Sequence, residues 1–168
     1  MKRIFVFFLW LLLHLGNSTP LADAARAGDV AEIRALTAKG ADPNELAGVN
    51  GWTPLMHAIH KNQRASVAAL LDAHADPNLA SPSGETPLMM AAGYGQTSIV
   101  QLLLARGANV RLTDKRGDSA LDYALTGTND IDDFTLFHCQ DETSRALIAA
   151  HAKAKPASLR FAKMKGCH

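Results

Sequence analysis

The chain has 168 residues, of which 48% are hydrophobic and 20% are charged, and its formal net charge is +1. This near-neutral balance argues against a nucleic-acid-binding protein, and the hydrophobic content argues against a disordered chain. Two cysteines are too few for a disulfide-rich scaffold or for two separate four-cysteine zinc sites. The length suits one domain or one short array of repeats.

Residues 1–18 have the features of a secretory signal peptide. Two basic residues precede a largely apolar run at residues 4–15, and small residues follow at 16–18. A membrane-spanning helix needs about 20 apolar residues, so a retained anchor is a weaker interpretation and a buried helix is weaker still. We therefore expect the protein to be exported, to a bacterial periplasm in the first instance, with secretion into the medium as the alternative.

The remainder of the chain repeats with a period of 33 residues, lengthened to 34 in the first unit. Two short motifs recur at this spacing. The first is TPLM or a variant of it, at residues 19–22, 53–56, 86–89 and 119–122. The second is GADPN or a variant of it, at residues 40–44, 74–78 and 107–110. Coincident motifs at one fixed period indicate a stack of similar units, each too small to bury its apolar face alone.

Within one unit the residue pattern predicts two short helices. Thr53 is a favourable N-cap, and Pro54 suits the first turn of a helix because its missing N–H has no partner to lose there. Leu55, Ala58 and Ile59 recur at i, i+3 and i+4 and so give the helix one apolar face. A second apolar helix follows after a short turn, and a small residue at the position of Ala58 lets neighbouring helices approach closely.

This pattern resembles the ankyrin repeat family, whose unit carries T-P-L-H-x-A and G-A-D-x-N motifs. The match is close over residues 19–125 and loose over 126–154. The resemblance implies an all-α fold, an ankyrin-type solenoid of four helix-turn-helix repeats preceded by the N-terminal signal peptide. The expected boundaries are 1–18 for the signal peptide, 19–52, 53–85, 86–118 and 119–155 for the repeats, and 156–168 for a basic C-terminal tail.

The first repeat also bears on where the leader is cleaved. One possible cut lies after Ser18, and another follows the A-x-A sequence that ends at Ala24. The later cut would remove most of the first helix of the first repeat. We therefore expect Thr19 to be the first residue of the mature chain.

The chain departs from the family pattern at several positions. Met56, Met89 and Asp122 stand where the family has the histidine of T-P-L-H, whose imidazole joins neighbouring loops by hydrogen bonds. Methionine is expected only to pack there. At the end of the second helix, Gly40 and Gly107 suit a left-handed residue, as does the family's glycine.

In the second repeat His74 takes that glycine's place, at some cost in strain.

The fourth repeat contains an insertion near residues 126–141, and its second helix is expected at 142–154. The insertion is acidic and the tail is basic, which favours a solvated loop and a solvated end cap that attract each other. Calcium binding by the aspartates at positions 130, 132 and 133 is a weaker alternative, because the glycine and the final glutamate of an EF-hand loop are missing.

Cys139 and Cys167 are the only cysteines. In an exported protein such a pair is expected to form one disulfide, which would stabilise the chain by about 3 kcal/mol by joining the tail to the insertion. Two alternatives stay open: a zinc site completed by His138 and His168, and free thiols.

No sequence motif for catalysis or for cofactor binding is present, so we expect no enzymatic activity, no cofactor and no metal. His57 and His60 are spaced to share a helix face, but further metal ligands are lacking, and a surface position or a contact with a partner is the better interpretation.

The function implied by the resemblance is recognition of another protein, by a monomer that neither binds nucleic acid nor inserts stably into a membrane. In ankyrin-like arrays the turn tips and the first helices of the repeats line a concave binding face. The residues that this places on the face are Trp52, His57, Lys61, Glu85, Met90, Tyr94, Lys115, Arg116, Asp118 and Tyr123. Trp52 and Met90 have a structural alternative, which is packing against the neighbouring repeat.

Two other functions remain open. The protein could be an accessory factor that stabilises an exported enzyme, or a secreted effector that neutralises a foreign protein.

Overall fold

A computed structural model describes residues 18–126 and 141–164 of the chain. The helices are α2 (Pro20–Ala27), α3 (Val30–Ala38), α4 (Pro54–His60), α5 (Arg64–Asp72), α6 (Pro87–Gly93), α7 (Thr97–Ala105), α8 (Ala120–Thr126), α9 (Asp141–Ala149) and α10 (Pro156–Met164). The described residues form no β-strand beyond two isolated bridges, so the predicted all-α fold is confirmed for this part of the chain.

Several predictions about the chain fall outside these residues. They concern the leader up to residue 17, the possible calcium ligands at 130, 132 and 133, and the four cysteine and histidine positions at 138, 139, 167 and 168.

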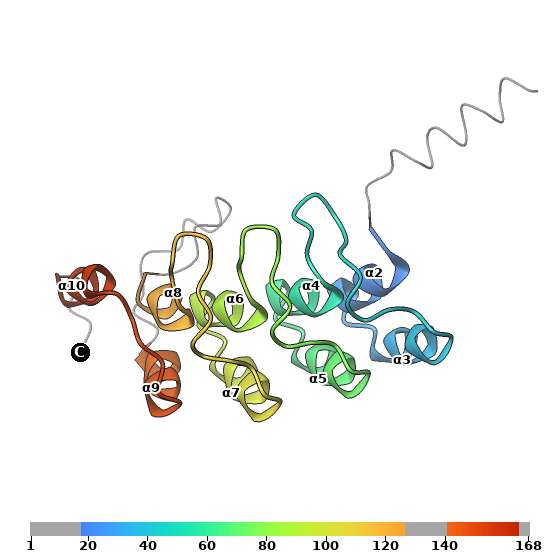
Figure 1. Ribbon diagram of the computed structural model, residues 1–168. Helices are drawn as coiled ribbons and strands as arrows, with labels where there is room; N and C mark the ends of the chain where they lie inside the picture. The colour runs from blue at the N-terminus through green and yellow to red at the C-terminus, as the bar shows by residue number, and fades with distance from the viewer. Residues whose placement is uncertain (1–17, 127–140, 165–168) are drawn as a thin grey trace, which may run out of the picture.

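The helices lie in two rows (Figure 1). The inner row is α2, α4, α6 and α8, in which each helix packs against the next, and the outer row is α3, α5, α7 and α9. The connections from an outer helix to the next inner helix project as loops beyond the inner row, all in the same direction. Helix α10 packs against α8 at the C-terminal end. A regular array of this kind places equivalent residues of successive units side by side.

The inner helices begin as the sequence predicts. Thr19, Thr53 and Thr86 each cap a helix, and each side-chain oxygen accepts a hydrogen bond of 3.2–3.3 Å from the backbone N–H three residues later. A proline follows each threonine in the first turn. In the third unit the methionine at the family's histidine position does more than pack, since the backbone N–H of Thr86 donates to Met89 Sδ at 3.4 Å.

The left-handed backbone positions are also as predicted. Gly40 and Gly107 have φ of 91° and 86°, and His74 adopts φ of 66° at the equivalent position. Residues with a Cβ rarely adopt this conformation. The second unit therefore keeps the backbone geometry of its neighbours although its residue there is unfavourable.

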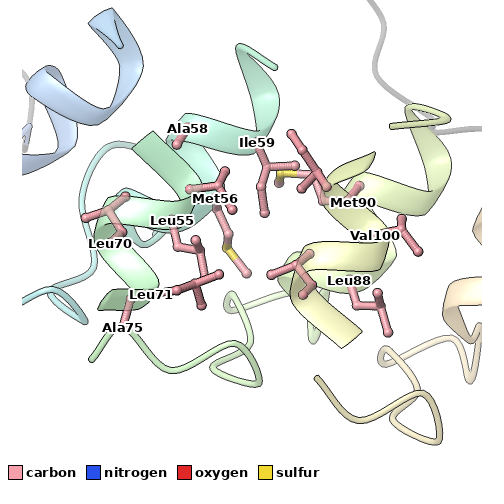
Figure 2. Close-up of a cluster of buried hydrophobic side chains, with 14 of the residues drawn as sticks. Leu55, Met56, Ala58, Ile59, Leu70, Leu71, Ala75, Leu88, Met90 and Val100 are labelled. Atoms are coloured by element: carbon pink, nitrogen blue, oxygen red, sulfur yellow. The ribbon is translucent and has the colours of Figure 1, made fainter. Parts of the chain in front are cut away.

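The core lies between successive units. Figure 2 shows Leu55 and Ile59 of α4 facing Leu88 and Met90 of α6, and all four side chains are fully buried. Ala58 of α4 is also fully buried, as are its counterparts in α6 and α8. The small alanines allow close approach and the larger side chains fill the space between units, so each unit is stabilised mainly by its neighbours.

The C-terminal end differs from its prediction. The last outer helix ends at Ala149 instead of continuing to 154, because His151 turns into the left-handed conformation with φ of 65°. The expected tail then forms α10, which is joined to α8 by Asp122. This carboxylate accepts the backbone N–H of Ser119 at 2.8 Å and that of Lys155 at 2.7 Å. The acid at the family's histidine position thus joins the loop to the terminal helix.

Candidate partner-binding surface

Three projecting loops share one backbone arrangement. In the first, Ala47 and Trp52 exchange two hydrogen bonds of 2.8 and 3.0 Å between their backbones. In the second loop the backbone N–H of Ser81 donates the equivalent bond to the carbonyl of Glu85 at 2.9 Å. In the third loop the N–H of Asp114 donates it to the carbonyl of Asp118, also at 2.9 Å. The first loop is one residue longer than the second, and Val49 at its tip is 99% exposed. Each loop therefore projects from a base that is held by backbone hydrogen bonds.

Aromatic rings connect the first loop to two inner helices. The ring of Trp52 lies 5.6 Å from that of His57 and 5.3 Å from that of His60, measured between ring centroids. His60 continues the contact to Tyr94, with centroids 5.7 Å apart and Nδ1 2.9 Å from the tyrosine oxygen. We call Trp52, His60 and Tyr94 the aromatic ladder. All three are only partly buried, so the ladder offers ring surface across two successive units.

His57 lies beneath this ladder. It is only 6% exposed, and its Nδ1 lies 3.4 Å from Nη2 of Arg26 on α2. Its Nε2 has no hydrogen-bond partner in the described part of the chain. Burial lowers the pKa of His57, and the positive charges of Arg26 and His60 lower it further, while the Ala47 backbone and Asp23 act in the opposite direction. A neutral imidazole is therefore favoured here.

Three predicted surface residues are buried, so the expectation that they face outward is wrong. Met90 is 1% exposed, His57 6% and Tyr123 7%. The reason is that each of these inner helices is covered on both sides, α4 and α6 by inner helices and α8 by α6 and α10, which leaves little of a seven-residue helix uncovered. The alternative reading of Met90, as a residue packed between repeats, is the one that its burial supports.

The third loop is fixed by a buried carboxylate that the sequence did not single out. Asp114 accepts hydrogen bonds from the backbone N–H groups of Arg116 and Asp118, from Nε of Arg116 at 3.0 Å and from the hydroxyl of Tyr123 at 3.1 Å. Burial alone would raise the pKa of Asp114, but these hydrogen bonds outweigh it and the pKa is lowered. A comparison of equivalent loop positions, Ala47, Ser81 and Asp114, is the signal that would have revealed it.

The partners of Asp114 are restrained in turn. The guanidinium of Arg116 lies 5.7 Å from the ring centroid of Tyr123 and donates to its hydroxyl at 3.1 Å. Asp118 forms ion pairs with Arg116 at 3.2 Å and with Lys155 at 2.7 Å. Burial raises the pKa of Tyr123, and the nearby acids raise it further. This loop is thus a preorganised charged surface rather than a set of independent side chains.

The remaining predicted residues are accessible. Lys61 follows α4 and is exposed, and so is Lys115 at the tip of the third loop. Glu85 and Asp118 are half-buried at the bases of their loops. The accessible cations and acids thus lie beside the aromatic ladder and along the loops.

The described residues contain no group of three or more His, Cys, Asp or Glu side chains placed to hold a metal ion. In the same residues, no helix has the length and apolar character needed to cross a membrane.

Comparison with known proteins points to one family. A model described as ankyrin repeats in three copies matches residues 8–81, and one described as ankyrin repeats in many copies matches residues 70–124. The bovine mitochondrial disaggregase is 40% identical over 75 residues, which are 41% of this chain and 11% of that protein.

Two further relatives carry the family in their names. The mouse ankyrin repeat domain-containing protein 40 is 41% identical over 56 residues, which are 33% of this chain and 15% of that protein. The Neurospora crassa ankyrin repeat protein nuc-2 is 41% identical over 56 residues, which are 33% of this chain and 5% of that protein. The similarity therefore covers the repeats and less than a sixth of each relative.

Proposed function

This chain belongs to the ankyrin repeat family, and we propose that it is a non-enzymatic protein that binds another protein through the face formed by its projecting loops and inner helices. Ankyrin repeats are generally protein-interaction modules. The observation that carries the proposal is the aromatic ladder of Trp52, His60 and Tyr94, which offers ring surface across two units.

The ladder has the properties of an interface anchor. Tryptophan and tyrosine are enriched among the residues that dominate binding energy. The contact of Tyr94 with His60 and that of His60 with Trp52 hold the rings in place before a partner arrives, which reduces the entropy lost on binding. Lys61, which follows His60, and Lys115, at the tip of the third loop, are exposed and would set the choice of partner more than the affinity.

Photo-crosslinking in the producing cell tests the proposal. A photoreactive amino acid is placed at Lys61 or at Lys115 on the inner side, and at Arg34 or Gln101 on the outer helices as matched exposed controls. The inner positions should capture the same protein, and the outer positions should not. Equal capture from both sides would contradict the proposed face.

A binding assay with the captured protein then tests the ladder itself. The Tyr94→Ala substitution should weaken binding at least tenfold, as expected for an interface anchor. The Gln101→Ala substitution on α7 is the control and should leave the affinity unchanged.

The proposal includes an exported location. Its support is that a cut after Ser18 leaves Thr19 as the N-cap of α2, so the first unit remains whole. N-terminal sequencing of the protein from cells should begin at Thr19. Retention of Met1 would contradict cleavage of the leader after Ser18.

A further inference from the structure

The C-terminal helix has a stripe of exposed residues on the side away from the array. Pro156, Leu159, Arg160 and Lys163 recur at i, i+3, i+4 and i+7, and all four are exposed. The opposite side of α10 is buried, including Ala162, and α10 packs against α8. The exposed stripe is therefore the outermost surface of the last helix.

The exposed side chains at this end are partly apolar. Leu159 of α10 is 51% exposed and Ile148 of α9 is 58% exposed, and they are two of the four large hydrophobic residues exposed in the described chain. Arg145 precedes Ile148 by three residues and is exposed on the same helix face. Terminal units of repeat arrays usually present a polar outer face to water. Two exposed aliphatic side chains at this end therefore need an explanation.

The same end carries an excess of positive charge. Residues 141–164, from the start of α9 to the end of α10, contain two acids, Asp141 and Glu142, and five bases, namely Arg145, Lys153, Lys155, Arg160 and Lys163. Lys155 forms an ion pair with Asp118. The other four form no ion pair among the described residues, which is also true of exposed array cations such as Arg34, Lys39 and Lys61, whereas Arg26, Arg106 and Arg116 are paired. The described part of this end thus presents an excess of exposed positive charge.

We propose that the outer faces of α9 and α10 form a peripheral docking surface for an anionic phospholipid bilayer. Arg145, Arg160 and Lys163 would contact the lipid phosphates, and Ile148 and Leu159 would enter the interfacial region. The combination of cations with apolar side chains supplies the two signals that reversible membrane association needs.

The exposure of these cations, without a described acid beside them, favours a bilayer over a folded acidic protein. Among the residues that the structure describes, the one side-chain hydrogen bond of these three cations is a long one, from Nε of Arg160 to the carbonyl of Pro156 at 3.3 Å. By contrast, Arg116 in the third loop is fixed by Asp114 and Tyr123. Exposed cations that no described acid fixes suit a fluid layer of phosphates, whereas a folded partner favours charges held in place.

Vesicle co-sedimentation of the purified full chain tests this proposal. Vesicles of phosphatidylglycerol and phosphatidylcholine in equal parts should bind the chain, and vesicles of phosphatidylcholine alone should not. Binding should weaken as salt rises from about 0.1 M to about 1 M, because the screening length falls from about 10 Å to about 3 Å.

Variants then locate the surface. The double variant Arg160→Gln with Lys163→Gln should lower the partition coefficient about 30-fold, since each cation near an anionic surface contributes about fivefold. Leu159→Ser should lower it about tenfold. The matched controls are Arg34→Gln with Lys39→Gln, exposed cations on and just after α3, and Val49→Ser at the first loop tip, and neither should change binding.

Three results would overturn the proposal. They are no binding to the anionic vesicles at low salt, an equal loss of binding in the control variants, and binding to soluble polyglutamate without binding to vesicles. The last result would assign the surface to an acidic protein instead. Circular dichroism of each variant checks that the fold is retained.

Discussion

The first and the third projecting loops have the same backbone arrangement, but their side chains are held by different means. The first is connected to the inner helices through Trp52 and a buried His57 whose Nε2 lacks a hydrogen-bond partner among the described residues. The third is held by Asp114, a carboxylate that accepts four hydrogen bonds from the residues around it. Burial of an unsatisfied polar atom costs about 1–3 kcal/mol, whereas a satisfied one stabilises.

One repeat geometry therefore tolerates two ways of holding a loop. Ring packing in the first loop leaves His57, a titratable group whose Nε2 has no hydrogen-bond partner among the described residues, at the junction of two units. Hydrogen bonding in the third loop, together with Asp122, fixes the last unit and α10 in one arrangement.

The largest effect is expected at Asp122. The substitution Asp122→Ala removes the acceptor of two backbone N–H groups, those of Ser119 and Lys155, and should destabilise the chain by about 3 kcal/mol. Urea unfolding measures this change, and Glu142→Ala, which removes an exposed carboxylate of α9, is the control. A change in Asp122→Ala no larger than that of the control would mean that α10 is not held through this carboxylate.

The two loops should also respond to pH in different ranges. Because the pKa of His57 is lowered in the folded chain, the unfolded chain binds its proton first as the pH falls below about 6.5. The stability that His57 contributes is complete above that pH and is lost as the pH falls toward the folded pKa, by at most about 1.4 kcal/mol per pH unit. His57→Gln should make the free energy of unfolding less dependent on pH in this range, and Arg26→Gln should reduce this dependence in part.

The carboxylates of the third loop and the last unit act at lower pH. The pKa values of Asp114 and Asp122 are lowered in the folded chain, so their contribution is complete above about pH 4 and is lost only as the pH falls further. An unchanged profile in His57→Gln between pH 7 and about 5 would remove the proposed contrast between the loops.

A smaller effect is expected from the hydroxyl of Tyr123. Tyr123→Phe keeps the ring but removes the group that donates to Asp114 and accepts from Arg116, and should cost about 1 kcal/mol. Thermal unfolding measures it, with Tyr94→Phe in the aromatic ladder as the matched variant. If Tyr123→Phe costs as much in a chain that already carries Asp114→Asn as it does in the unaltered chain, the hydroxyl acts independently of the carboxylate.

The smallest effect concerns the backbone alone. His74→Gly replaces a residue with φ of 66° by one that adopts this conformation freely, and should stabilise the chain by about 0.5 kcal/mol. Gly107→Ala is the reverse change at the equivalent position of the next unit and should destabilise. If His74→Gly destabilises instead, the imidazole has a stabilising contact that offsets its strain.

Much of the fold could be predicted from the sequence because the repeat motif encodes local chemistry. Threonine before proline predicts where the inner helices begin, and glycine predicts where the outer helices end. The tail carries neither motif, so α10 was not expected. The small residues Ser158 and Ala162, spaced four apart, form the buried side of α10. This pattern is too weak to predict a helix unless the contact with Asp122 on α8 is already known.

The candidate surface was predicted less well, for a geometric reason. Position in the motif predicts that a residue belongs to an inner helix, but burial depends on how closely the neighbouring units approach. Met90 and Tyr123 are therefore buried, while Tyr94 at the end of its helix remains accessible. Asp114 lies outside both repeat motifs, so the sequence signals it only through a comparison of equivalent loop positions, and its hydrogen bonds come from the structure.

The extra residue in the first loop has a practical consequence. It places Val49 at the tip of the loop, where its side chain is 99% exposed. The base of the loop is closed by two backbone hydrogen bonds. A peptide tag or a fluorescent label inserted at this tip should be accepted without unfolding the chain, since insertions are tolerated where neither packing nor backbone pairing is broken. The label would then stand next to the aromatic ladder and report directly on what binds there.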